Sequence, residues 1–128
     1  MTETTETRTG RCHCGAVVFE VPFDGAWKKL RRCDCSLCRR KGAIMASVPV
    51  ETLRIVEGHD ALRLYQWNTK VAEHWFCGTC GIYTHHRRRS DPSEYGINLG
   101  CVEGVDLEAL GDIPWLRGST SSVEEKRP

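Results

Sequence analysis

Seven of the eight cysteines in this chain lie in three tight clusters, and their spacing constrains the fold more than any other feature of the sequence. The clusters are Cys12 and Cys14; Cys33, Cys35 and Cys38; and Cys77 and Cys80, with Cys101 standing apart. Cysteines two or three residues apart can direct their sulfurs to one metal ion. Thiolates held in this way favour zinc, with iron–sulfur clusters or copper as alternatives. The spacing therefore predicts a metalloprotein with two zinc ions.

A disulfide scaffold is the competing interpretation of so many cysteines. It requires an oxidising compartment, and the polar segment 1–10 is not of the secretory or transit type. Disulfide frameworks usually join cysteines from separate loops, whereas C-x-C and C-x-x-C pairs readily chelate one ion. We therefore expect reduced, metal-bound cysteines and a cytoplasmic protein. No apolar run approaches the ~18 residues of a membrane helix.

The length of 128 residues predicts one domain. Polar ends suggest a flexible tail over 1–9, a zinc-binding domain over 10–118 and a second flexible tail over 119–128. A net charge of +1 argues against a dedicated nucleic-acid binder, which would be clearly basic. The sequence leaves open whether the chain forms a homo-oligomer.

Short runs of β-branched and aromatic residues predict a mostly β protein built from antiparallel strands. Strands are expected over 16–21, 44–50, 53–57, 62–67 and 95–99, and strands over 70–76 and 82–87 are expected to flank the CGTC turn as a hairpin with a metal at its tip. Helix is expected only over 105–110, with one helical turn over 35–40. Trp67, Trp75, Phe76 and Tyr83 are expected in the core of the sheets.

The C-x-x-C turn reads as a metal knuckle because strands flank it on both sides, unlike a thioredoxin-type redox pair at the start of a helix. A closed structural zinc needs two further ligands. Residues at i and i+2 of an extended chain face the same side, so Cys12 and Cys14 can supply them. The predicted structural site is therefore Cys12, Cys14, Cys77 and Cys80.

Cys33, Cys35 and Cys38 remain to hold a second ion. Three protein ligands and one open position are typical of catalytic zinc. Cys101 has two interpretations: it closes this site as a fourth ligand, or it is a buried thiol near the metal but not bound to it.

Other residues have both a functional and a structural interpretation. Arg39, Arg40 and Lys41 either bind the carboxylates of a substrate or are ordinary surface charges. The basic run 87–89 is either a solvated strand end or a functional group of charges, as part of an anion-binding rim or as a nucleic-acid contact. His85 and His86 are either a proton shuttle or packing residues. His13 is expected to face away from the metal.

Four segments carry a resemblance to a known family: CHCGAVVFEV, CDCSLCRRKG, FCGTCGIYTHHR and INLGCVEGVDLEAL. In order and spacing they resemble the glutathione-dependent formaldehyde-activating family, which also contains relatives of centromere protein V, over residues 10–110. The resemblance implies a β-tent fold of antiparallel sheets pinned by zinc. It also implies that Cys12, Cys14, Cys77 and Cys80 hold a structural zinc and that Cys33, Cys35 and Cys38 hold a catalytic one.

The activity implied by the resemblance is the joining of glutathione and formaldehyde into S-(hydroxymethyl)glutathione, with glutathione as co-substrate. The expected function is thus a zinc-dependent carbon–sulfur lyase or synthase acting on a small thiol and an aldehyde. The alternative is a non-enzymatic, zinc-stabilised module that binds glutathione, protein or nucleic acid.

Overall fold

The computed structural model describes residues 6–120, which form ten β-strands, one α-helix and five short 3-10 helices. The strands are β1 (Glu6–Arg11), β2 (Val18–Phe23), β3 (Lys28–Cys33), β4 (Met45–Pro49), β5 (Arg54–Glu57), β6 (Leu62–Tyr65), β7 (Glu73–Cys77), β8 (Tyr83–Arg87), β9 (Glu94–Asn98) and β10 (Trp115–Leu116). The helices are α1 (Ser36–Lys41) and the 3-10 turns η1 (Val50–Thr52), η2 (His59–Ala61), η3 (Leu99–Cys101), η4 (Leu107–Leu110) and η5 (Gly118–Thr120). The mostly β fold is confirmed.

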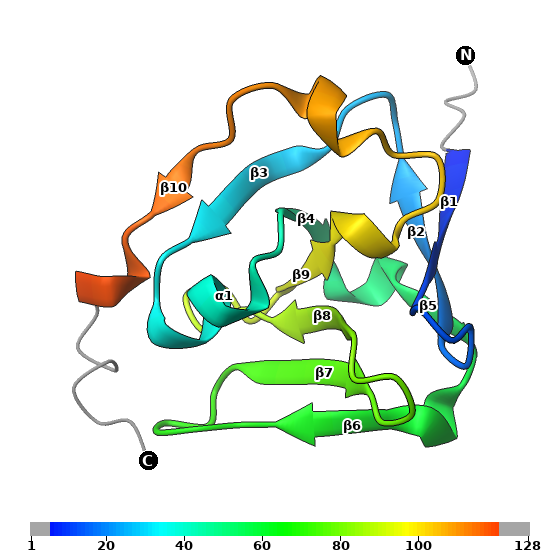
Figure 1. Cartoon of the computed structure of the whole chain (residues 1–128), viewed down its shortest axis with the longest axis horizontal. Helices are drawn as coiled ribbons and strands as arrows, with labels where there is room; N and C mark the ends of the chain where they lie inside the picture. The colour runs from blue at the N-terminus through cyan, green and yellow to red at the C-terminus, as the bar shows by residue number, and fades with distance from the viewer. Residues whose placement is uncertain (1–5, 121–128) are drawn as a thin grey trace.

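The strands make two sheets, shown in Figure 1. A three-stranded sheet has the order β1-β2-β5, and a seven-stranded sheet has the order β10-β3-β4-β9-β8-β7-β6. All pairs between neighbours are antiparallel except β10 with β3, which is parallel. This architecture is the expected arrangement of short antiparallel sheets with little helix.

Every strand expected from the sequence is present within a few residues of its expected bounds, and the 35–40 turn is α1. Three strands were not expected, namely β1, β3 and the two-residue β10. β3 reads KKLRRC and β1 reads ETRTGR, so both lack the apolar alternation that marks a strand. The 105–110 helix is instead the 3-10 turn η4, because Asp106 accepts the amide of Glu108 as a cap and Gly111 ends the turn one residue after Leu110.

The central strands β4 and β8 are buried on both faces over most of their length. On one face, Ala46 and Val48 join Ile97 and Leu99 against Phe19 of β2, so the main core lies between the two sheets. On the other face, Met45 and Tyr83 pack with Cys38 of α1. Alternation along β4 therefore points its side chains into two separate layers, and the second layer carries the chemistry described below.

The folded part of the chain extends slightly beyond the expected domain. β1 begins at Glu6 and pairs with β2 along its whole length, so residues 6–9 belong to the sheet rather than to a tail. At the other end, Ser119 bonds to Asp34. Residues 1–5 and 121–128 lie outside the described residues. Over residues 6–120, α1 is six residues long, and no helix has the length and apolar character needed to cross a membrane.

Candidate metal centres and the adjoining cavity

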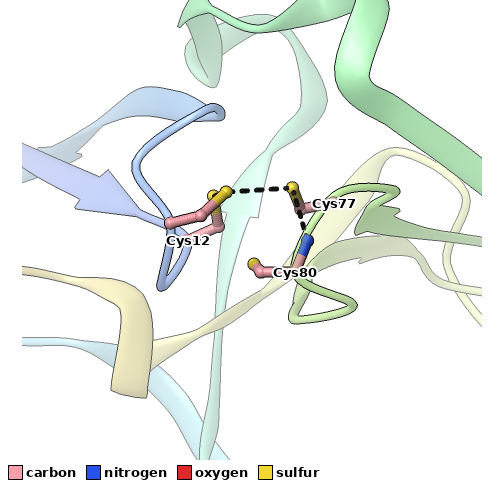
Figure 2. Close-up of side chains that lie close together, drawn as sticks. Cys12, Cys77 and Cys80 are labelled. Atoms are coloured by element: carbon pink, nitrogen blue, oxygen red, sulfur yellow. Dashed lines mark hydrogen bonds between the residues drawn. The ribbon is translucent and has the colours of Figure 1, made fainter.

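The four cysteines predicted to form one site do come together, from two loops that are far apart in the sequence. Cys12 and Cys14 lie in the β1–β2 turn, and Cys77 and Cys80 lie at the β7–β8 turn. Their ligand atoms all lie within 4.8 Å of one another. Figure 2 shows Cys12 facing Cys77 and Cys80 across the gap between the two loops. This cluster, which we call the first cluster, joins the three-stranded sheet to the seven-stranded sheet.

The spacing of the sulfurs fits a tetrahedral metal centre. Zn–S bonds of about 2.3 Å in a tetrahedron place neighbouring sulfurs about 3.8 Å apart. The Sγ atoms of Cys12 and Cys14 are 3.7 Å apart, as are those of Cys14 and Cys77. All eight cysteines are free thiols, so the clusters are not disulfides. The donor set and its geometry therefore fit zinc.

Backbone amides support the sulfurs of the first cluster. Val17 N donates to Cys12 Sγ at 3.2 Å, and Thr79 N donates to Cys77 Sγ at 3.4 Å. A hydrogen bond from the backbone amide of Cys14 is the main cause that lowers the pKa of Cys80 to about 6. Amides aimed at sulfur favour the thiolate, which is the form that binds metal.

Cys33, Cys35 and Cys38 form the second cluster, also with ligand atoms within 4.8 Å of one another. Cys33 ends β3, and Cys35 caps α1 by accepting the amide of Cys38 at 3.2 Å. Hydrogen bonds from Cys35 and Cys38 lower the pKa of Cys33, which favours its thiolate. One strand end and one helical turn thus present three sulfurs at a single point.

Asp34, between two of these cysteines, holds the last described segment over the second cluster. Its carboxylate accepts Ser119 N at 2.9 Å and Ser119 Oγ at 3.0 Å, and it pairs with Arg117 at 3.2 Å. Gly118 is consequently so close that a Cβ there would lie 2.7 Å from Cys33 Sγ. The segment after β10 therefore forms one wall of the site, which the sequence did not indicate.

Cys101 is not part of the second cluster. It is buried in the main core, and its Sγ lies 3.5 Å from the carbonyl oxygen of Tyr83. Burial raises the pKa of this thiol to about 12, with smaller contributions from Cys12 and Cys80 of the first cluster. Of the two interpretations, the geometry favours a buried thiol, and it places that thiol nearer the first cluster than the sequence suggested.

A cavity of about 190 Å³ opens directly onto the second cluster. Its lining combines all three cysteines with Met45 and Trp67. Typical sites for drug-sized ligands are roughly 300–1,000 Å³. The cavity is therefore smaller than a typical site for a drug-sized ligand, and a larger molecule bound there would extend out of it.

The cationic groups of the cavity come from β3 and from the segment after β8 rather than from the helix. Arg31, Arg88 and Arg89 line it, and no acidic residue is among the described residues that do. Arg39 and Arg40 of α1 are exposed and are not among the lining residues. The run 87–89 is thus divided: Arg88 and Arg89 belong to the rim of the cavity, while Arg87 bonds to the carbonyl of Pro92 at 2.7 Å.

Lys41 lies at the end of α1, beside the second cluster. Its Nζ is 2.8 Å from His74 Nδ1 and 3.7 Å from the centre of the Tyr83 ring. Burial lowers the pKa of Lys41 to about 8, and the three thiols partly oppose that shift. Lys41 is therefore the cation placed to offset negative charge on the thiolates.

The histidines divide between the two faces of β8. His86 lines the cavity, stacks on His74 with 5.2 Å between ring centres, and bonds through Nδ1 to the Tyr83 hydroxyl at 2.6 Å. Burial lowers the pKa of His74 to about 3 and holds that of His86 well below its usual value. His85 packs edge-on against Tyr95 in the other layer. Neutral histidines that pack in this way fit a structural role better than the role of a proton shuttle.

Sequence reasoning missed Arg31 and His74. Arg31 lies in β3 and His74 lies in β7, and neither residue is part of a recognised sequence motif. Among the aromatic residues expected in the core, Tyr83 is buried, whereas Trp67, Trp75 and Phe76 are half-buried. Trp67 lines the cavity instead. His13 is exposed.

Comparison with known proteins gives one family and two informative relatives. The family model described as glutathione-dependent formaldehyde-activating enzyme matches residues 7–112. A Halomonas elongata protein, provisionally named as a glutathione-dependent formaldehyde-activating enzyme, is 36% identical over 80 residues, or 56% of this chain. The chain's match spans about half of that relative (50%). The crystal structure of a Rhodobacter sphaeroides protein is 55% identical, with a TM-score of 0.80 over 84% of this chain and 99% of that one.

Proposed function

Because the chain belongs to the glutathione-dependent formaldehyde-activating enzyme family, we propose that it catalyses the reversible addition of a thiol to a small aldehyde. Glutathione and formaldehyde are the substrates to test first, and the product would be S-(hydroxymethyl)glutathione. In the direction of cleavage this is a carbon–sulfur lyase. The proposal includes two zinc ions per chain and a cytoplasmic location.

The observation that carries the proposal is the open second cluster. Three cysteines meet at the floor of a cavity, and the only other cysteine outside the first cluster, Cys101, lies elsewhere in the described structure. A structural zinc has four protein ligands, whereas a catalytic zinc keeps one position free. The first cluster, with its four sulfurs, fits the structural role.

Zinc held by Cys33, Cys35 and Cys38 would lower the pKa of an entering thiol, so that a thiolate is available at neutral pH. The sulfur then forms a bond to the carbonyl carbon of the aldehyde, and the carbon–oxygen π pair moves to the oxygen. That oxygen gains one proton, which balances the proton lost by the thiol. The reverse sequence cleaves the adduct.

The residues of the chain contribute position and charge to this reaction. The aldehyde carbon would lie in the cavity that the apolar side chains of Met45 and Trp67 help to line, where its contact with water is reduced. Lys41 offsets the negative charge that accumulates when a fourth thiolate joins three others. Arg39 and Arg40, proposed from the sequence as carboxylate ligands, are exposed and do not line the cavity, so a carboxylate bound by them would lie outside it.

The test is the exchange rate between formaldehyde hydrate and S-(hydroxymethyl)glutathione, measured by magnetisation-transfer NMR with and without zinc-loaded protein. We expect acceleration that is abolished in Cys35→Ser and retained in Cys101→Ala. Metal analysis accompanies each variant. No acceleration by protein that holds both zinc ions would refute the enzyme and favour the binding module, and loss of the second zinc in Cys101→Ala would show that Cys101 is a ligand.

A further inference from the structure

Residues 114–120, which we call the strap, lie along the end of β3 and then against the second cluster. β10 runs beside β3 in Figure 1, and the two strands pair in parallel with Leu116 opposite Cys33. The backbone amides of Arg32 and Asp34 donate to carbonyl oxygens of the strap at 2.9 Å and 3.1 Å. The strap therefore follows the stretch of backbone that leads into the second cluster.

The carboxylate of Asp34 holds the strap beyond the end of β10. It accepts the amide and the hydroxyl of Ser119, at 2.9 Å and 3.0 Å, and pairs with Arg117 at 3.2 Å. Asp34 and Ser119 are 85 residues apart in the sequence, so these bonds join two distant segments rather than shape a local turn. Because Asp34 lies between Cys33 and Cys35, the strap is tied to the backbone of the second cluster itself.

The strap contacts the cluster through the backbone of Gly118. A Cβ on this residue would lie 2.7 Å from Cys33 Sγ and 2.7 Å from Cys35 Cβ. Gly118 is not among the glycines with positive φ, so the close approach, and not the backbone conformation, requires a residue without a side chain. The amide of Gly118 also donates to Cys33. Two ligand residues of the cluster are thus packed directly against the strap.

The strap lies outside residues 7–112, the part of the chain that matches the family model. It also lies beside the cluster that has fewer ligands, since the second cluster offers three sulfurs and the first offers four. Groups that orient metal ligands from behind contribute to the affinity for the ion. Such support matters more for an ion that has one protein ligand fewer.

We propose that the strap positions Cys33 and Cys35 for the second zinc ion and slows the loss of that ion. The inference rests on the part of the proposed function that places zinc at the second cluster, and it does not depend on the reaction. Gly118 packs against both residues, which restricts their movement away from the metal and covers one side of the sulfur of Cys33. Gly118 and Asp34 are therefore positioning residues and not catalytic ones.

The test is the rate at which an excess of a chromophoric chelator removes zinc from each cluster. The phase that belongs to the second cluster is the one that is absent when Cys33 and Cys35 are replaced by serine. Asp34→Ala releases the strap, and Gly118→Ala forces it away from the sulfurs while leaving Asp34 in place. We expect each variant to lose the second zinc about 10- to 100-fold faster, the range by which changes behind metal ligands weaken metal binding.

Cobalt loaded in place of zinc reports the coordination geometry through its visible absorption. We expect Asp34→Ala and Gly118→Ala to change the absorption of cobalt at the second cluster and to leave that of the first cluster unaltered. The first cluster is thus an internal control, because a general loss of stability would affect both. Asp34→Asn keeps one acceptor oxygen for Ser119, and we expect it to release the second zinc at an intermediate rate.

Asp91→Ala is the matched control. Asp91 accepts the amide and the hydroxyl of Ser93, at 3.1 Å and 2.5 Å, so it makes the same two kinds of hydrogen bond as Asp34. These bonds lie within a local turn and do not hold a distant segment against the second cluster. We expect Asp91→Ala to release both zinc ions at the rates of the wild type.

Hydrogen exchange of the wild type tests the inference without any variant. Coupling between two sites is reciprocal, so zinc at the second cluster should stabilise the strap as much as the strap stabilises zinc. We expect the amide of Ser119, which donates to Asp34, to exchange more slowly when both clusters hold zinc than when only the first does. Equal exchange rates in the two states would overturn the inference.

The release rates give further grounds for rejection. Wild-type release from Asp34→Ala and Gly118→Ala, or equal acceleration at both clusters, would overturn the inference. A wild type that binds no second zinc would overturn it together with the metal content of the proposed function. Zinc retention that depends on the strap, without aldehyde exchange, would refute the proposed reaction and leave this inference standing. Aldehyde exchange, with zinc retention that ignores the strap, would do the reverse.

Discussion

Replacing Cys12 and Cys14 of the first cluster should destabilise the protein more than replacing two cysteines of the second cluster. The paired perturbations are the double variants Cys12→Ser with Cys14→Ser, and Cys33→Ser with Cys35→Ser. In the first, no zinc can bridge the β1–β2 turn to the β7–β8 turn. In the second, only a local link between the end of β3 and α1 is lost.

The magnitude follows from the length of chain that each metal closes. Cys14 and Cys77 are 63 residues apart, whereas Cys33 and Cys38 are 5 apart (38 − 33). The entropy of loop closure scales as (3/2)RT ln n, so the ratio of these lengths corresponds to about 2 kcal/mol in the free energy of unfolding. For a domain of this size, that difference is roughly 5–10 °C in Tm.

The assay is thermal and urea unfolding followed by circular dichroism, in reductant and excess zinc, with zinc content measured for each variant. Cys101→Ala serves as a control for the loss of a buried thiol outside both clusters. Equal losses of stability in the two double variants, with the expected zinc contents, would refute the loop-closure reasoning. So would wild-type stability in the variant that lacks Cys12 and Cys14.

Three further predictions concern single residues. Because burial lowers the pKa of His85 to about 4, the folded state binds a proton less readily than the unfolded state, and stability is lost as the pH falls from 6.5 towards 4. His85→Gln should reduce that slope by up to about 1.4 kcal/mol per pH unit, measured by urea unfolding at pH 6.5 and 5.5; an unchanged slope would contradict the assignment. Gly58→Ala should reduce the free energy of unfolding by more than the ~1–2 kcal/mol of an alanine in the left-handed conformation, because its Cβ would overlap the Ala16 carbonyl. Gly104 also has a positive φ but lies in open space, so Gly104→Ala should cost only that amount in the same unfolding assay. Lys41→Met should weaken zinc binding at the second cluster about tenfold, measured by competition with a chromophoric chelator. The control is Arg40→Met, which removes a charge from the exposed face of α1. Equal zinc affinities of the two variants would argue against the role of Lys41.

The local features of this protein are the ones that its sequence determines. Sulfurs two or three residues apart must lie close together in space, so the pincer of Cys12 and Cys14 and the α1 turn around Cys38 follow from spacing alone. Strands such as β2 and β9 could be predicted from their β-branched and aromatic residues, because the pattern of apolar residues in a segment is a local property of the sequence. Even the pairing of the first two cysteines with the CGTC turn was predictable, because a closed zinc site needs four ligands.

The tertiary structure decided which distant groups share a cavity. β3 carries almost no strand signal, yet its pairing with β4 buries Arg31 against Ser47 and leaves one guanidinium nitrogen without a partner. Packing of the sheets placed Cys101 in the main core rather than beside the second cluster. A strand's sequence gives the alternation of its side chains, but what each face meets depends on strand order and on the layer packed above it. For that physical reason, the two cysteine clusters could be predicted from the sequence, and the residues that line the adjoining cavity could not.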